Sequence, residues 1–337
     1  MSGLLLSSLV LTHGSIGLRD LVGGSVPGYA SLLVLLNCGV TLPLEWYRSY
    51  RLEREYALSL ISAREWWRDY AKTAVLSTGA GLVAVECVHF GMRASPVWWW
   101  LIGAAAASAC LVVLTILGPV LLLPMFHRFR PLDHERLRQR LLALCARAGV
   151  PVLSVHQWGI GERTRRANAA LVGAGATRRI LISDTLMAEY TEDEIEVVLA
   201  HEIGHHVHRD VANSLILELL VLLAAFFAAS VALDLSWQSL GFRSPDDVAA
   251  IPVIALAAGA VVVAATPLLN AWSRRNERRA DRFALALTSR PEAFVAAVRR
   301  MAAQNLAEER PTLAARWFFA THPGVEERVG SARERGV

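Results

Sequence analysis

Long apolar stretches separated by shorter polar ones dominate the pattern along this chain of 337 residues. An apolar stretch of about 20 residues is long enough to cross a membrane as a helix. The stretches of that kind run over residues 26–47, 73–92, 96–126, about 212–236 and about 249–272. The apolar opening at 4–11 is too short for another span. The pattern therefore predicts a mainly α-helical, polytopic membrane protein with about five transmembrane helices.

The segment between the third and fourth spans is less apolar and has its own periodicity. Residues 133–148 alternate Leu and Arg with the period of an amphipathic helix. Weaker alternation predicts short strands at 151–158, 169–172 and 179–183, with Gly173 and Gly175 in the turn between the last two. We therefore expect a small α+β insertion between the membrane helices.

These patterns divide the chain into four parts. A helix is predicted over 291–307, after the last span. The expected parts are an N-terminal transmembrane region (1–126), the α+β insertion (127–191), a helix hairpin with two spans (192–290) and a C-terminal tail (291–337).

Composition agrees with a membrane protein and argues against several other classes. The hydrophobic fraction is 54% and the net charge is +4, without a dense basic patch, so nucleic acid is not an expected partner. Mean hydropathy is +0.38. The four cysteines form no Cys-x-x-Cys pair, which argues against a disulfide framework. Heavy use of Ala and Arg suggests a GC-rich bacterial genome.

The distribution of basic residues predicts the orientation in the cell membrane. The loop at 46–72, the segment at 127–211 and the tail are rich in Arg, whereas the opposite loops carry only Arg19, Arg93 and Arg243. Basic loops stay on the cytoplasmic side. With five spans, we expect the N-terminus outside and the insertion and C-terminus in the cytoplasm.

The strongest candidate for chemistry is the sequence His-Glu-Ile-Gly-His at 201–205. On a helix, His201 and His205 lie on one face, one turn apart. Two imidazoles with this spacing can bind Zn²⁺, and Glu202 beside them can take a proton from water. The Thr191-Glu192-Asp193-Glu194 capping box predicts where this helix begins. The alternative is a surface histidine cluster.

A second pair of residues can complete such a metal site. Glu277 and Asp281 are also four apart, at the end of the fifth span. A hairpin of spans four and five would return Glu277 opposite the two histidines. We expect Glu277 as the third zinc ligand and Asp281 as the partner of a ligand histidine. The alternative is a solvated face of Arg and Glu residues held by local ion pairs.

With these motifs the chain resembles the integral-membrane zinc peptidases related to the type 1 CAAX prenyl endopeptidase and the bacterial heat-shock membrane protease. The matching stretches are Asn168-Ala169, 179–186, 201–205, 277–281 and Thr321-His322-Pro323, in the family's order. The loop at 51–72 resembles the prenyl-protease branch. Two features depart from that branch: its members have seven spans, and they have Tyr where this chain has Ala170.

The resemblance implies endopeptidase chemistry on a peptide or membrane-protein substrate. It implies that Asn168 and Ala169 belong to a substrate-binding strand and that His322 lies near the metal. His322 could donate to an oxyanion, and Arg328 could pair with Asp281 or with a substrate carboxylate. The plainer alternatives are an ordinary turn Asn, a His-Pro turn in the tail and a solvated Arg.

Two other functions remain open at this stage. A signalling metalloprotease of the antirepressor-receptor type would cleave one specific regulator, although the short outer loops leave little room for a sensor domain. A non-catalytic scaffold could also retain the fold, but the intact Glu202 argues against it.

Overall fold

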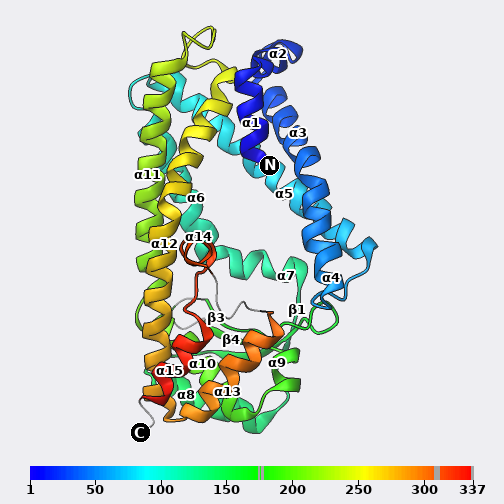
Figure 1. The fold of residues 1–337 in the computed structure, drawn as a ribbon, viewed down its shortest axis with the longest axis vertical. Coiled ribbons are helices and arrows are strands. Elements are labelled where there is room, and N and C mark those ends of the chain that lie inside the picture. Colours follow the sequence, from blue (N-terminus) through cyan, green and yellow to red (C-terminus); the bar gives the residue numbers. More distant parts are fainter. Residues whose placement is uncertain (174, 176–177, 307–311, 335–337) are drawn as a thin grey trace. The chain divides into compact units, whose positions relative to one another are not determined.

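The structure is a computed structural model that describes residues 1–173, 175, 178–306 and 312–334 (Figure 1). Five of its helices are long and apolar enough to cross a membrane. They are α3 (Val26–Trp46), α5 (Ala63–Ala94), α6 (Trp99–Leu121), α11 (Asp210–Ser236) and α12 (Ile251–Thr288). The predicted fold class is therefore confirmed, and each predicted span falls within or close to one of these helices.

Several helix ends follow from single residues. Ser62 and Glu65 form a capping box that begins α5, ten residues before the predicted span. Pro119 lies inside α6, and a separate short helix, α7 (Leu123–Phe126), follows it. α12 continues well past the predicted end at residue 272 and thereby carries the acidic pair on the same helix as the fifth span.

The chain forms two compact units, and the first consists of residues 1–52, 62–112 and 217–265. It contains α1 (Ser2–Leu11), α2 (Gly14–Leu21), α3, the π-helical turn η1 (Tyr47–Leu52), α5 and parts of α6, α11 and α12. α1 is apolar but short, as expected. A short 3₁₀ helix, η3 (Val248–Ala250), precedes α12, and Tyr29, Leu33 and Val248 pack together there.

The second unit consists of residues 53–61, 113–216 and 266–337 and contains the α+β part of the chain. Its sheet has the order β1-β2-β4-β3, in which β2 and β4 are parallel and the other pairs are antiparallel. The strands are β1 (Arg128–Pro131), β2 (Ser154–Gly159), β3 (Ala169–Val172) and β4 (Arg179–Ser183). The last two strands have the predicted bounds, whereas β1 was not predicted.

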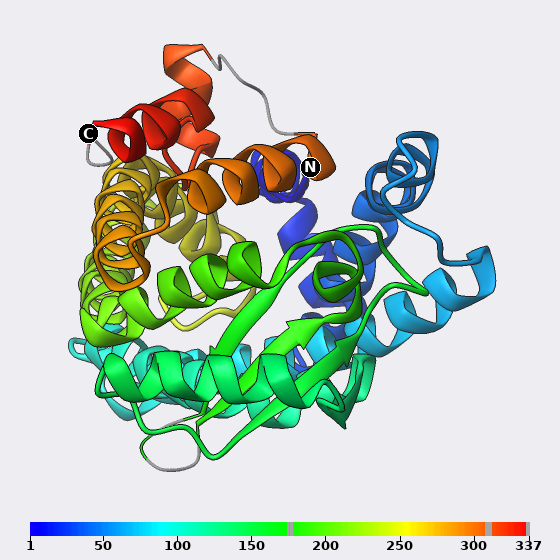
Figure 2. The ribbon, with the colours of Figure 1, turned by 90° about the horizontal axis from the view of Figure 1, so that it is seen from below.

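Helices pack around this sheet and enclose the largest apolar core (Figure 2). They are α8 (Glu135–Arg147), α9 (Asp184–Glu189), α10 (Glu192–Val207), α13 (Pro291–Gln304) and α15 (Val325–Arg333); two shorter ones, α4 (Glu53–Glu55) and α14 (Leu313–Phe319), complete the unit. α10 contacts β3, α8 and α13. α8 and α13 were predicted, although the predicted end of α13 at Ala307 lies outside the described residues.

Candidate active site

α10 brings the two candidate histidines onto one face. The helix begins at a capping box, in which the Thr191 N–H donates to Glu194 Oε2 at 2.7 Å. One turn separates His201 from His205, and their Nε2 atoms lie 3.1 Å apart. The predicted capping box and helix are therefore present, and the side chains converge as the four-residue spacing requires.

Gly204 lets α12 come close to these histidines. A Cβ added at Gly204 would lie 3.0 Å from the Ala280 Cα atom of α12 and 3.3 Å from Ala280 O. Both residues are fully buried. A larger residue at either position would push the helices apart, so the Gly204–Ala280 contact sets the distance across which Glu277 reaches α10.

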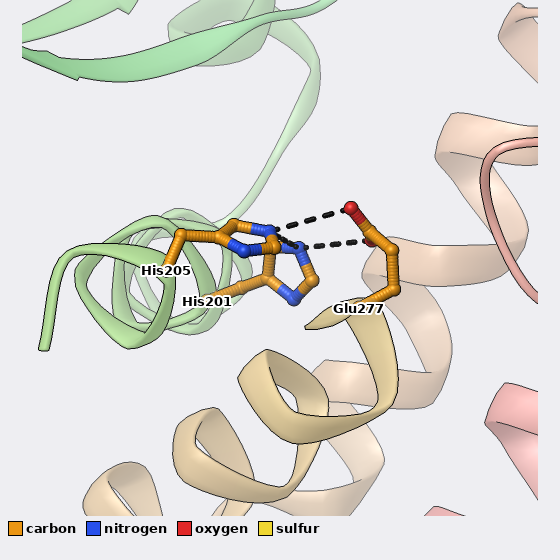
Figure 3. Close-up of side chains that lie close together, drawn as sticks. All are labelled: His201, His205 and Glu277. Carbon is orange, nitrogen blue, oxygen red and sulfur yellow. Dashed lines mark hydrogen bonds and ion pairs between the residues drawn. The ribbon is translucent and has the colours of Figure 1, made fainter. Parts of the chain in front are cut away.

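Glu277 faces the two imidazoles from α12 (Figure 3). Its Oε2 atom is 3.3 Å from His201 Nε2, and its Oε1 atom is 3.3 Å from His205 Nε2. One potential ligand atom from each of the three residues lies within 4.8 Å of the others. Among the described residues this is the group of histidine and acidic side chains arranged to hold a metal ion.

The chemistry of the group fits a divalent cation. Glu277 Oε2 is buried, and no N–H of the described residues is aligned for a hydrogen bond to it, although the Nδ1 atom of His322 lies 2.8 Å away. Four carboxylates gather around the histidines, but only two guanidinium groups accompany them: Glu202, Glu277, Asp281 and Asp210 against Arg279 and Arg328. The excess of buried negative charge requires a cation or protons.

Asp281 lies behind His201, as predicted. It is 3% exposed, and its Oδ1 atom is 2.8 Å from His201 Nδ1. Arg328 holds this carboxylate with two hydrogen bonds, of 2.8 Å from Nε and 2.6 Å from Nη2. Of the two predicted partners of Arg328, Asp281 is therefore the one in contact.

Asp210 lies behind His205 in the same way, and the sequence analysis did not identify it. Its Oδ2 atom is 2.9 Å from His205 Nδ1, and Arg279 also pairs with it. α10 ends at Val207, and α11 begins at Asp210. Arg209 between them has a left-handed backbone (φ 56°), and this break turns Asp210 back toward His205.

A cavity of about 470 Å³ opens onto His201, Glu202 and Glu277. Its walls come from the sheet, α10, α13 and the tail and are largely apolar. The residues around it are His127, Trp158, Ile160, Thr164, Arg166, Ala167, Asn168, Val197, Val198, His201, Glu202, Glu277, Phe294, Ala297, Val298, Met301, Asn305, His322 and Arg328. Such a cavity, with a few polar groups at one end, is typical of a binding site.

The environment changes the proton affinity of the groups on α10. Burial raises the pKa of Glu202, which favours its acting as a base near neutral pH. Burial opposes protonation of His201, but the carboxylates of Asp281 and Glu277 outweigh it and raise its pKa to about 9. A cation bound at this group would therefore compete with a proton on His201.

His322 reaches the same carboxylate from the tail. Its Nδ1 atom is 2.8 Å from Glu277 Oε2, and its side chain is 62% exposed at the edge of the cavity. His322 therefore lies next to the group formed by His201, His205 and Glu277.

The two candidate substrate-binding residues differ in position. Asn168 lines the cavity, and its side-chain amide makes no hydrogen bond to the described residues; its backbone N–H donates to Ser183 Oγ at 2.9 Å. Ala169 is 5% exposed, pairs with Ile182 of β4 and does not line the cavity.

Fold and site together define the class of membrane metallopeptidases. A sequence model described as Peptidase family M48 matches residues 131–336, and one described as "CAAX prenyl protease N-terminal, five membrane helices" matches residues 27–128. The chain belongs to peptidase family M48. The expected relationship to the CAAX prenyl endopeptidases is thus confirmed, although residues 27–128 contain only three of the five candidate spans.

Individual relatives agree with this assignment. The Bacillus subtilis metalloprotease YhfN is 28% identical over 91% of this chain and 73% of its own length. CAAX prenyl protease 1 of Saccharomyces cerevisiae is 29% identical, but the match spans 56% of this chain and only 42% of the yeast protein. The crystal structure of S. mikatae Ste24p superposes with a TM-score of 0.83 at 21% identity, covering 91% of this chain and 75% of that one.

Proposed function

We propose that this protein is a zinc-dependent endopeptidase that hydrolyses peptide bonds at the cytoplasmic face of a bacterial cell membrane. The observation that carries the proposal is the convergence of His201, His205 and Glu277 beside Glu202 at the end of an apolar cavity.

The donor set favours zinc over the common alternatives. Two imidazole nitrogens and one carboxylate are a typical set of three protein ligands for catalytic Zn²⁺, which leaves further positions open. Mg²⁺ and Ca²⁺ prefer oxygen ligands. Asp281 and Asp210 would each hold the second nitrogen of one histidine and so fix the orientation of both rings.

When bound, zinc supplies a Lewis acid that polarises the scissile carbonyl and lowers the pKa of a water molecule. Glu202 takes a proton from the attacking water as the water oxygen forms a bond to the carbonyl carbon. Glu202 then passes the proton to the leaving nitrogen when the C–N bond breaks. The raised pKa of this buried carboxyl suits both transfers.

His322 would stabilise the charge that develops on the carbonyl oxygen. It stands at the cavity edge, next to Glu277, and its imidazole can donate one hydrogen bond into the cavity. Arg328 acts differently, because both of its hydrogen bonds hold Asp281, so we assign it a positioning role behind His201.

We propose that the substrate is an extended peptide or a segment of a membrane protein. Among the described residues β3 is an edge strand that pairs with β4, so its other edge is available for a peptide backbone. Asn168 precedes this strand at the cavity, where its free side-chain amide could bind the substrate backbone. Ala169 would contribute through its position in the strand and not through its side chain.

The activity can be tested with the purified full-length protein and an unbiased peptide pool, with cleavage sites identified by mass spectrometry. We expect internal cleavage that a chelator abolishes and Zn²⁺ restores. The absence of cleavage by protein that carries a full complement of zinc would contradict the proposal.

We also propose that the N-terminus lies outside and that the active site and C-terminus lie in the cytoplasm, because the Arg-rich loops require it. The test introduces a cysteine at Gln238 or at Arg136, whose side chain is 82% exposed. Intact cells that carry each variant are then treated with an impermeant maleimide. Labelling above that of the parent chain is expected only at position 238. The reverse pattern would overturn this orientation.

A further inference from the structure

α14 is a short helix in the tail whose apolar side chains have almost no cover. The exposed fractions are 75% for Leu313, 49% for Trp317, 43% for Phe318 and 84% for Phe319. Leu313 and Trp317 lie on one face of the helix, and Phe318 and Phe319 follow in its last turn. Apolar side chains gathered in this way mark an interaction surface.

The carboxyl end of α14 is held by polar groups of α12. Asn270 Nδ2 donates to Trp317 O at 3.0 Å. Arg274 Nη1 donates to Arg316 O at 2.9 Å and to Ala320 O at 2.7 Å. Asn270 and Arg274 are both buried, so the attachment to α12 is firm, and the Trp317 ring lies 5.9 Å from the Arg274 Cζ atom.

The place of attachment fixes the depth of α14 relative to the bilayer. From Ile251 to Ser273 the sequence of α12 contains no charged residue, and Arg274 is the first. Arg275 and Arg278 follow and are exposed. The boundary between hydrocarbon and headgroups therefore falls near Arg274, which is where α14 is attached.

We propose that α14 is an interfacial anchor whose apolar face inserts into the headgroup region of the bilayer. Trp and Phe are suited to this depth, and the neighbouring Arg side chains suit the phosphates of lipid headgroups. The fifth span lies in the bilayer, so the surface of the same bilayer reaches the exposed side chains of α14. No second protein is needed to cover them.

The anchor also bears on the loop that contains His322. Only Ala320 and Thr321 separate α14 from this residue, whose Nδ1 atom contacts Glu277. Seating α14 at the membrane surface fixes the height of the loop over the cavity. The anchor itself follows from the membrane spans and the exposed face, and it does not depend on the proposed peptidase activity.

The test uses the full-length protein in vesicles of phosphatidylcholine and phosphatidylglycerol. Phe319→Cys carries a bimane label, and Arg136→Cys on α8 serves as the water-exposed control; the labelled parent chain gives the background of the native cysteines. Phe319 is 84% exposed, so its replacement leaves the core intact. Quenching by lipids with a nitroxide near the headgroup is compared with quenching by aqueous iodide.

We expect the lipid nitroxide to quench the label at 319 several-fold more than the label at 136, and iodide to show the opposite order. Iodide quenching at 319 as strong as at 136 would overturn the proposal, because α14 would then face water. Protection from both quenchers would also overturn it, since the helix would then be covered by protein.

Discussion

Two buried charged clusters in this protein follow the same physical rule and differ in how completely their polar atoms are paired. In the first unit, the Arg19 cluster comprises Ser15, Arg19, Tyr29 and Asp247. In the second, the histidine cluster comprises His201, His205, Asp210, Glu277 and Asp281. Charges removed from water must be paired in both.

The Arg19 cluster is closed. Asp247 accepts from Arg19 Nη1 at 2.5 Å, from the Arg243 N–H at 2.9 Å and from the Ala249 N–H at 3.0 Å. Ser15 Oγ lies 2.6 Å from Tyr29 Oη and donates to Ala249 O. Each charge has a protein partner, so this cluster stabilises the packing of α2 against η3.

The histidine cluster is open. Its outer carboxylates pair with guanidinium groups, whereas the inner one, Glu277, faces three imidazoles, and no N–H of the described residues is aligned for a hydrogen bond to its Oε2 atom. The comparison indicates that a closed cluster serves stability, whereas unmatched buried atoms at a cavity indicate a ligand.

The largest expected effect on stability comes from opening the closed cluster. Asp247→Ala leaves the Arg19 guanidinium, which is 6% exposed, without its buried partner. Breaking such a pair costs about 3–5 kcal/mol. The midpoint temperature of thermal unfolding in detergent should therefore fall well below that of the parent. The zinc content of the folded variant should be unchanged.

The matched control for that change is Asp20→Ala, because Asp20 also pairs with Arg19 but is 51% exposed. Asp20→Ala should lower the unfolding temperature only slightly, because the pair is exposed to solvent. If both variants unfolded like the parent, the Arg19 cluster would have no structural role and the comparison would fail.

His322→Ala tests the open side of the histidine cluster. Removal of one donor to a developing oxyanion typically lowers kcat by about 10²–10³-fold. Because His322 is not one of the three proposed ligands, bound zinc should stay at one equivalent and KM should change little. His206→Ala on α10 is the control. Turnover at the parent rate would reduce the His322 loop to a cap on the fold.

Asp210→Asn tests whether the outer carboxylates orient the ligand histidines. Loss of such a partner typically lowers metal affinity by about 10–100-fold. Zinc competition with a chromophoric chelator measures this directly, and excess zinc should restore turnover. Asp193→Asn, at the exposed beginning of α10, should bind zinc like the parent. Equal affinity in both variants would remove Asp210 from the site.

Asn168→Ala has the smallest expected effect, because it removes one polar contact outside the histidine cluster. A hydrogen bond to substrate contributes about 0.5–1.5 kcal/mol, so kcat/KM should fall about 10-fold at most, with zinc retained. Peptide kinetics at several substrate concentrations give this number. Unchanged kinetics would make this stretch a scaffold.

Much of this architecture could be predicted from local sequence, because hydropathy and four-residue spacing are local properties. The five spans, the capping box of α10 and the bounds of β3 and β4 all follow from short patterns. To predict that Glu277 converges with His201 and His205, it was enough to assume in addition that spans four and five form a hairpin.

What could not be predicted depends on tertiary contacts. β1 is a four-residue strand that exists through its pairing with β2. Asp210 reaches His205 only because Arg209 adopts a left-handed backbone, which local propensity disfavours. The close contact of Gly204 with Ala280 exists only once α10 and α12 are packed.

The central claim is that the open cluster binds zinc and that Glu202 is the base beside it. The most direct test is Glu202→Gln, measured for bound zinc by mass spectrometry and for cleavage of a peptide that the parent cleaves, with His205→Ala beside it. We predict that Glu202→Gln retains one zinc and loses nearly all turnover, whereas His205→Ala loses both. Cleavage by Glu202→Gln at the parent rate would contradict the account.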